Sequence, residues 1–136
     1  MTQEKKIFLP IQSNDICEAY EQLLRAELVS FSLTKEARNK VDSTVANING
    51  TYFGHEMYDT AEEKAVAYFY FLIKNHPFVD GNKRTATLTF LVVCQLNKLA
   101  LKEIDFELDQ LAVFIESIQE KNHQEVIKRI AGLLFG

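Results

Sequence analysis

Residues 76–85 read HPFVDGNKRT, and this polar segment lies between two of the most apolar stretches of the chain, 65–73 and 88–94. The first stretch belongs to a segment that opens with Thr60 and Glu63, a capping-box pattern that predicts a helix from there to about residue 75. Its second half is apolar on every side, which is typical of a helix buried within a protein. Proline at position 77 ends it, and a second apolar helix is expected from about 82 to 97. Two central helices joined by a tight polar loop are therefore the organising feature.

Four more helices are expected around this pair, over about 13–28, 33–48, 109–121 and from residue 122 onward. Apolar residues at helical spacing are expected to face inward, Leu28, Phe114, Ile118 and Leu133 among them. The stretch 51–58 is rich in aromatic residues and interrupted by Gly54, which favours an extended flap or hairpin. The sequence thus predicts an all-α helical bundle with a small β-hairpin flap.

The bulk composition describes a typical globular protein. The 136 residues fit one domain, 1–136, with 47% apolar and 25% charged residues. A net charge of −4 argues against a nucleic-acid surface, which usually carries a basic excess. No apolar stretch is long enough for a membrane span and the first residues lack a signal-peptide pattern, so a cytoplasmic protein is expected. Cys17 and Cys94 lie in apolar helical patterns and are expected to be buried, reduced thiols.

The polar loop combines residue types that suit phosphate chemistry. Gly81 lies where a loop turns into a helix, and the first N–H groups of a helix attract anions. Lys83 and Arg84 add two positive charges to the same turn, the second able to grip two phosphate oxygens at once. The carboxylate of Asp80 could hold Mg²⁺, and His76 has a side chain suited to accepting a proton near neutral pH. These are the parts of a phosphoryl or nucleotidyl transfer site.

Each part also has an ordinary structural interpretation. Asp80, Gly81 and Asn82 alone would be a turn with a helix cap, the two cations a solvated face, and His76 a helix-end histidine. All of them, however, fall within nine residues between two apolar helices. A charged turn fixed to a rigid core is how functional loops are usually built, and we therefore favour a functional site.

The segment from His76 to Arg84 resembles the signature of Fic-domain proteins, H-P-F-x-[D/E]-G-N-x-R. With Lys83, Arg84 and Thr85 in succession it is more similar still to the Doc branch, the death-on-curing toxins of toxin–antitoxin operons. The resemblance covers about residues 45–100 and includes Phe53-Gly54 and Met57-Tyr58 before the first central helix. It implies a Fic/Doc-type helical bundle.

The resemblance also implies the cofactors ATP and Mg²⁺ and a role for each residue of the loop. His76 would deprotonate a hydroxyl group of the target protein, and Asp80 would bind the metal. The phosphates would be bound by Gly81, Asn82, Lys83 and Arg84. The target segment would be held by the flap residues Tyr52, Phe53, Gly54 and His55.

Three positions bear on which group is transferred. AMP-transferring Fic proteins usually carry glycine where Lys83 stands and a second arginine where Thr87 stands. The lysine matches the Doc branch and favours phosphoryl transfer from ATP to a target such as elongation factor Tu, which would block translation. Gly81 follows the Fic pattern, because Doc itself has alanine there, so protein AMP-transfer stays an alternative. The missing second arginine leaves a catalytically silent nucleotide- or partner-binding module as a third.

Control by a separate antitoxin protein is favoured over control within the chain. Many Fic proteins carry a self-inhibitory helix that reads [S/T]-x-x-x-E-[G/N]. Ser32 and Glu36 fit its first part, but Ala37 breaks the pattern. An arginine to pair with such a glutamate is also missing, because Thr87 occupies that position.

Overall fold

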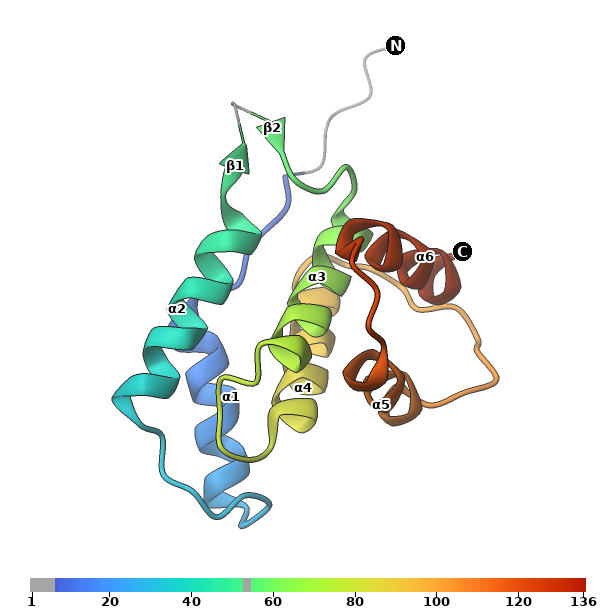
Figure 1. Cartoon of the computed structure of the whole chain (residues 1–136). Coiled ribbons are helices and arrows are strands. Elements are labelled where there is room, and N and C mark those ends of the chain that lie inside the picture. The colour runs from blue at the N-terminus through green and yellow to red at the C-terminus, as the bar shows by residue number, and fades with distance from the viewer. Residues whose placement is uncertain (1–6, 53–54) are drawn as a thin grey trace.

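The computed structural model describes residues 7–52 and 55–136, and helices make up nearly all of the regular structure in them. The elements, in chain order, are α1 (Ser13–Arg25), α2 (Lys35–Asn49), β1 (Thr51–Tyr52), β2 (His55–Glu56), α3 (Ala61–Lys74), α4 (Asn82–Leu96), α5 (Leu108–Ser117) and α6 (His123–Phe135). α3 and α4 form the centre, with α1 and α2 on one side of them and α5 and α6 on the other (Figure 1). α3 contacts α2, α4, α5 and α6, so it is the helix around which the others are arranged.

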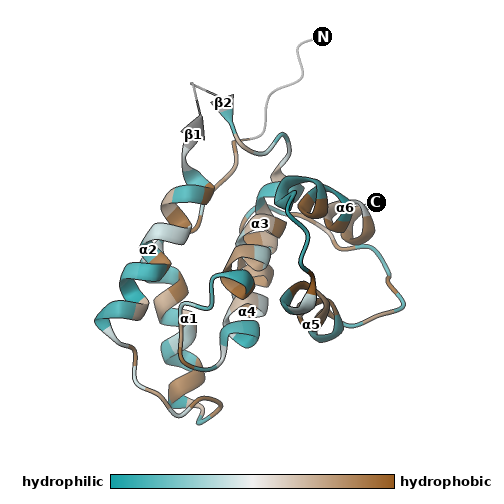
Figure 2. Ribbon diagram, viewed as in Figure 1, coloured by the Kyte–Doolittle hydropathy of each residue, from teal (hydrophilic) through white to brown (hydrophobic). Residues whose placement is uncertain are grey.

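The start of α3 is fixed by the expected capping box. The Glu63 N–H donates to Thr60 Oγ1 at 3.1 Å, and the Glu63 carboxylate accepts the Thr60 N–H at 3.2 Å. Behind this cap, α3 is buried over most of its length, and Figure 2 shows it largely in the brown of hydrophobic residues. The prediction of a helix surrounded by protein is confirmed for α3.

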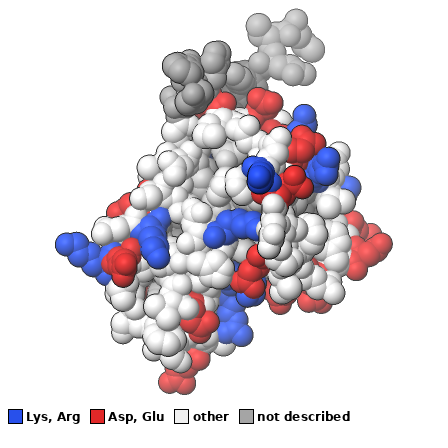
Figure 3. Space-filling model, viewed as in Figure 1, with Lys and Arg blue, Asp and Glu red and all other residues white. Residues whose placement is uncertain are grey.

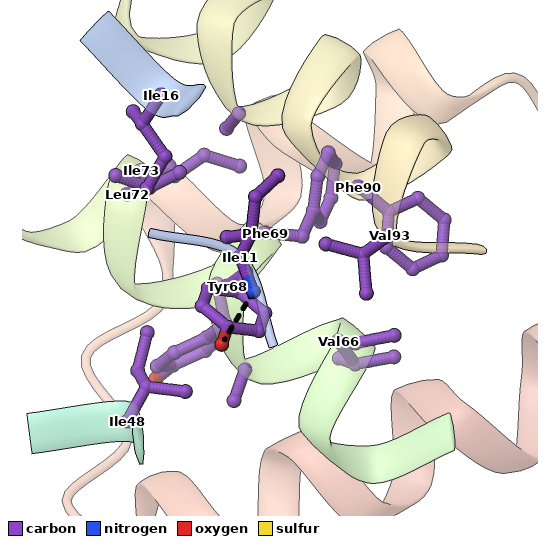
Figure 4. Packing of buried hydrophobic residues seen from close by; sticks show 14 of the residues in the cluster. Ile11, Ile16, Ile48, Val66, Tyr68, Phe69, Leu72, Ile73, Phe90 and Val93 are labelled. Carbon is purple, nitrogen blue, oxygen red and sulfur yellow. Dashed lines mark hydrogen bonds between the residues drawn. The ribbon is translucent and has the colours of Figure 1, made fainter. Parts of the chain in front are cut away.

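The core between α3, α4 and α1 is built from interlocking aliphatic and aromatic side chains (Figure 4). Phe69 of α3 packs on Phe90 of α4 with ring centroids 5.3 Å apart, and both rings are fully buried. The one polar group that Figure 4 draws in a hydrogen bond is the hydroxyl of Tyr68, which accepts the Ile11 N–H at 3.3 Å. The same hydroxyl donates to Asn49 Oδ1, so it is buried without losing its partners. Cys17 and Cys94 are buried and free.

α1 ends three residues earlier than the sequence predicts, at Arg25 instead of 28. Glu27 takes a left-handed conformation with φ 60°, and the Leu28 N–H reaches back to the Leu23 carbonyl at 2.9 Å. This is the Schellman arrangement, which closes a helix by satisfying its last carbonyls. Leu28 is therefore outside the helix and half-exposed, contrary to expectation, and Val29 after it is buried.

Some other expectations about inward-facing residues on the outer helices were wrong. α5 ends at Ser117 instead of 121, because Ile118 is extended; Ile118 is partly buried and still packs against the core, as expected. Phe114 and Leu133 are about half-exposed. On α4, Leu91, Val92 and Leu96 are also exposed, because a helix of 3.6 residues per turn can bury only part of a sequence that is apolar all round.

The hairpin expected near residues 51–58 is present as a pair of very short strands. β1 and β2 are antiparallel, with Thr51 opposite Glu56 and Tyr52 opposite His55. The predicted flap residues Phe53 and Gly54 lie outside the described residues. No helix within 7–52 and 55–136 has the length and hydrophobicity that crossing a bilayer requires.

Candidate functional site

The loop between α3 and α4 is held at its start by two consecutive side chains that reach different helices. Lys74 Nζ donates to the Ile118 carbonyl just beyond α5. Asn75 Nδ2 donates to Thr44 Oγ1 of α2 at 2.9 Å. His76 follows in a left-handed conformation with φ 45°, which is uncommon for a residue other than glycine. The backbone position of the histidine is therefore tied to α2 and α5 through its two predecessors.

The middle of the loop is closed by Asn82, whose side chain is 7% exposed. Its Oδ1 accepts the Phe78 N–H and its Nδ2 donates to the Phe78 carbonyl, both at 2.9 Å. The same Nδ2 lies 3.4 Å from His76 Nδ1. Phe78 is buried and stacks on Tyr20 of α1, with ring centroids 4.4 Å apart and planes 11° from parallel. The Asn82 amide thus braces the loop internally, while the Phe78 ring anchors it to α1.

Gly81 turns the loop into α4. It has φ 78° and ψ 18°, a left-handed conformation that glycine adopts without cost, and it is the N-cap of the helix. The first intrahelical bond runs from the Thr85 N–H to the Gly81 carbonyl at 2.9 Å, so the N–H groups of residues 82–84 have no partner in the helix ladder. A Cβ at position 81 would lie 2.4 Å from Val29 Cγ1, so the segment after α1 packs directly against this turn.

A pocket of about 430 Å³ opens in front of this turn. It is lined by Leu28, His76, Val79, Asp80, Gly81, Asn82, Lys83, Arg84 and Glu116. All six loop residues that the sequence singles out for catalysis, metal and phosphate are therefore brought to one pocket. The side chains of the predicted flap residues, 52–55, lie outside what the structure describes. The face of the molecule in Figure 3 shows basic and acidic side chains interspersed, with no extended field of one sign.

The two basic side chains of the turn point to different partners. Lys83 Nζ lies 3.0 Å and 3.2 Å from the two carboxylate oxygens of Glu116. Arg84 donates from one terminal nitrogen to the Leu28 carbonyl at 2.8 Å, at the end of the Schellman turn. Thr87 donates its hydroxyl to the Lys83 carbonyl at 2.8 Å, within the helix, and does not line the pocket.

Glu116 is a residue of the pocket that the sequence did not reveal. It lies in the last turn of α5, 40 residues from His76 in the sequence, and its carboxylate is 3.4 Å from His76 Nε2. A glutamate on the solvated side of a predicted helix carries no distinguishing pattern. The only signal is its place at a helix C-terminus, where the helix dipole disfavours a negative charge.

Asp80 is exposed and lines the pocket next to the N-cap. Burial raises the pKa of Tyr20 above its ordinary value, and the negative charge of Asp80 raises it further. Among the described residues no group of three or more His, Cys, Asp or Glu side chains could hold a metal ion by itself. Mg²⁺ commonly binds through one or two carboxylates together with substrate phosphates and water, and a single carboxylate at a phosphate site fits that mode.

Comparison with known proteins agrees with the geometry of the loop. The family model described as Fic/DOC family matches residues 10–94. A protein named Toxin Doc from Mycolicibacterium smegmatis is 33% identical over 92 residues, which cover 66% of this chain and 70% of that relative. No solved structure matches the chain. The matched region spans α1 to most of α4 and includes the whole loop of the pocket, so the chain belongs to the Fic/DOC family.

Proposed function

We propose that this protein transfers the γ-phosphoryl group of ATP to a hydroxyl group of a target protein, as a Doc-like toxin. The observation that carries the proposal is the convergence of an imidazole, an ammonium, a guanidinium and the free N–H groups of α4 on one pocket. Fic/DOC proteins are typically nucleotide-dependent protein transferases that use ATP and Mg²⁺. The convergence fits that chemistry, because phosphoryl transfer depends almost entirely on positioning and charge stabilisation.

The polar residues of the loop divide the tasks of the proposed reaction. His76 accepts the proton of the target hydroxyl while that oxygen forms a bond to the γ-phosphorus. The bond from this phosphorus to the β–γ bridging oxygen breaks, and ADP leaves with the electron pair. Arg84, Lys83 and the N–H groups of Gly81 and Asn82 balance the charge on the phosphate oxygens.

The pocket fits both cofactors. Its volume of about 430 Å³ is within the range of small-molecule sites, and its lining includes a lysine and an arginine, side chains that bind phosphate oxygens. Asp80 would hold Mg²⁺, which supplies charge neutralisation between phosphate oxygens when bound. The donors and the carboxylate come from one continuous turn, so their mutual positions do not depend on the relative placement of distant elements.

Two side chains favour phosphoryl over adenylyl transfer. Lys83 lines the pocket where AMP-transferring members have glycine, and it adds a positive charge to the turn. Thr87 replaces the second arginine and bonds within its own helix, so Arg84 is the one guanidinium among the residues that line the pocket. Gly81 is the observation that favours the alternative, because it follows the AMP-transferring pattern.

The partners of this activity follow from the same resemblance. The similarity to a Doc toxin supports an antitoxin protein as a partner, and elongation factor Tu is the target type we propose. The flap around β1 and β2 is the element proposed to hold the target segment by strand pairing.

The experiment uses ATP labelled either at the γ-phosphate or at the α-phosphate, incubated with the protein, Mg²⁺ and purified elongation factor Tu or whole lysate. Transfer of the γ-label alone is expected, and transfer of the α-label would overturn the kinase proposal in favour of AMP transfer. His76→Ala should abolish transfer of either label, whereas His123→Gln, a histidine outside the pocket, should retain it. A rise in melting temperature with Mg-ATP, without labelling of any protein, would instead support a silent binding module.

A further inference from the structure

The two ring nitrogens of His76 have different neighbours. The orientation of the Asn82 amide is fixed, because its Oδ1 must accept the Phe78 N–H and its Nδ2 must donate to the Phe78 carbonyl. Nδ2 is therefore the atom that faces His76 Nδ1, at 3.4 Å. The other ring nitrogen, Nε2, lies 3.4 Å from the Glu116 carboxylate.

The same carboxylate pairs with the ammonium group of Lys83 in the first turn of α4. Glu116 bonds Lys83 Nζ through both of its oxygens, at 3.0 Å and 3.2 Å. Of the residues that line the pocket, Lys83 and Arg84 are basic and Asp80 and Glu116 are acidic, so the charges cancel while the imidazole is neutral. A carboxylate between an ammonium and an imidazole nitrogen takes the position that two oxygens of a phosphate group would take.

Glu116 is on the wrong side of the imidazole to assist proton abstraction. A carboxylate that orients a catalytic histidine bonds the nitrogen turned away from the substrate and leaves the other nitrogen free. Here the nitrogen turned into the loop is occupied by Asn82, and Glu116 contacts the nitrogen that faces the pocket. While Glu116 lies there, its carboxylate occupies the position beside Nε2 that a target hydroxyl would need.

The backbone that carries Glu116 is anchored, but its side chain is not enclosed. The bond from Lys74 to the Ile118 carbonyl ties the end of α5 to the end of α3, next to the histidine. The Glu116 side chain is 35% exposed, so rotation of that side chain toward solvent is sufficient to release both partners. We infer that Glu116 is a further residue of the site, an acidic placeholder that occupies Lys83 and His76 Nε2 until the phosphate chain of the substrate displaces it.

This inference rests on the proposed function for the identity of the anion, but it can be tested by binding alone. The probes are inorganic tripolyphosphate and Mg-ATP, titrated by calorimetry against the full chain. Glu116→Gln removes the charge and keeps the shape, so it should tighten both ligands about tenfold, since a carboxylate no longer repels the phosphates and no longer neutralises the lysine. Glu120→Gln makes the same charge change outside the pocket and should alter either affinity by less than about twofold.

A double-mutant cycle with Lys83→Met isolates the contact. If Glu116 is paired with the Lys83 ammonium in the ligand-free protein, removal of Lys83 should weaken tripolyphosphate binding more in the Glu116→Gln background than in the wild type. Equal losses in both backgrounds, or weaker binding by Glu116→Gln itself, would overturn the inference. Tighter binding by Glu116→Gln in a protein that transfers no label would refute the proposed function and leave the placeholder intact, so the two failures are distinguishable.

Discussion

The turn at Gly81 should not tolerate a side chain without a loss of stability. Gly81→Ala places a methyl group 2.4 Å from Val29 Cγ1, at a backbone φ of 78°. The left-handed conformation costs a non-glycine residue about 1–2 kcal/mol. The close contact adds about 1–3 kcal/mol, because Val29 is buried and its branched side chain has little freedom to move. The expected loss in the free energy of unfolding is therefore about 2–5 kcal/mol.

Urea and thermal unfolding followed by far-UV circular dichroism measure this loss, since the chain contains no tryptophan for fluorescence. For a chain of this length 1 kcal/mol corresponds to about 3–5 °C, so the melting temperature should fall by at least about 6 °C. Gly132→Ala is the matched control. Nothing lies within 4 Å of the Cβ that it would add in α6, and it should stabilise the protein by about 0.4–1 kcal/mol.

The close contact between position 81 and Val29 can be tested with a double variant. Val29→Ala alone should cost about 2 kcal/mol for the lost burial. In the double variant the smaller side chain relieves the clash, so the combined loss should be less than the sum of the two single losses by about 1–3 kcal/mol. Strictly additive losses, or a Gly81→Ala variant as stable as the wild type, would refute the account of this turn.

Three further predictions concern other groups in the structure. Asn82→Ala should lower the free energy of unfolding by about 2–4 kcal/mol and abolish transfer, because it leaves the buried N–H and carbonyl of the loop without partners; denaturation and the labelling assay measure the two effects. His123→Ala should cost about 1–3 kcal/mol, whereas His123→Gln should cost less, because the hydroxyl of buried Tyr70 bonds His123 Nδ1 at 2.6 Å and only glutamine offers a replacement partner; urea unfolding compares them. Burial raises the pKa of Tyr58 to about 12, so the neutral phenol stabilises the fold below the ordinary value near 10, and this contribution should be lost as the pH rises through about 12. Stability measured against pH tests the sign, and the dependence should be weaker in Tyr58→Phe but not absent, because burial also raises the pKa of Tyr20, Tyr68 and Tyr70.

The sequence predicted the elements whose signals are local. The start of α3 was predicted because Thr60 and Glu63 bond each other's backbone over three residues. The loop was predicted because proline and glycine restrict or permit specific backbone angles whatever surrounds them. The sequence also predicted that His76 lies near the first turn of α4, because only five residues separate His76 from Asn82.

What the sequence could not predict depends on packing between distant segments. Glu116 enters the pocket only because α5 packs on α3 and α4, and nothing in its own neighbourhood distinguishes it from other exposed glutamates. The early end of α1 arises from a left-handed Glu27, a residue that favours helix by propensity, so the stop signal is in the tertiary contacts of Leu28 and Val29. Apolar composition alone also failed to show which residues of α4 face outward, because Leu91, Val92 and Leu96 are as hydrophobic as the buried ones.

The bonds of Lys74, Asn75 and His76 make the imidazole sensitive to three helices at once. Their partners belong to the α5 end, to α2 and to the first turn of α4, respectively. A displacement of about 1 Å can cost an enzyme about a hundredfold in rate even when it originates far from the chemistry. A partner protein that binds α2 or α5 on its outer surface can therefore displace the imidazole, and so lower the rate, without entering the pocket.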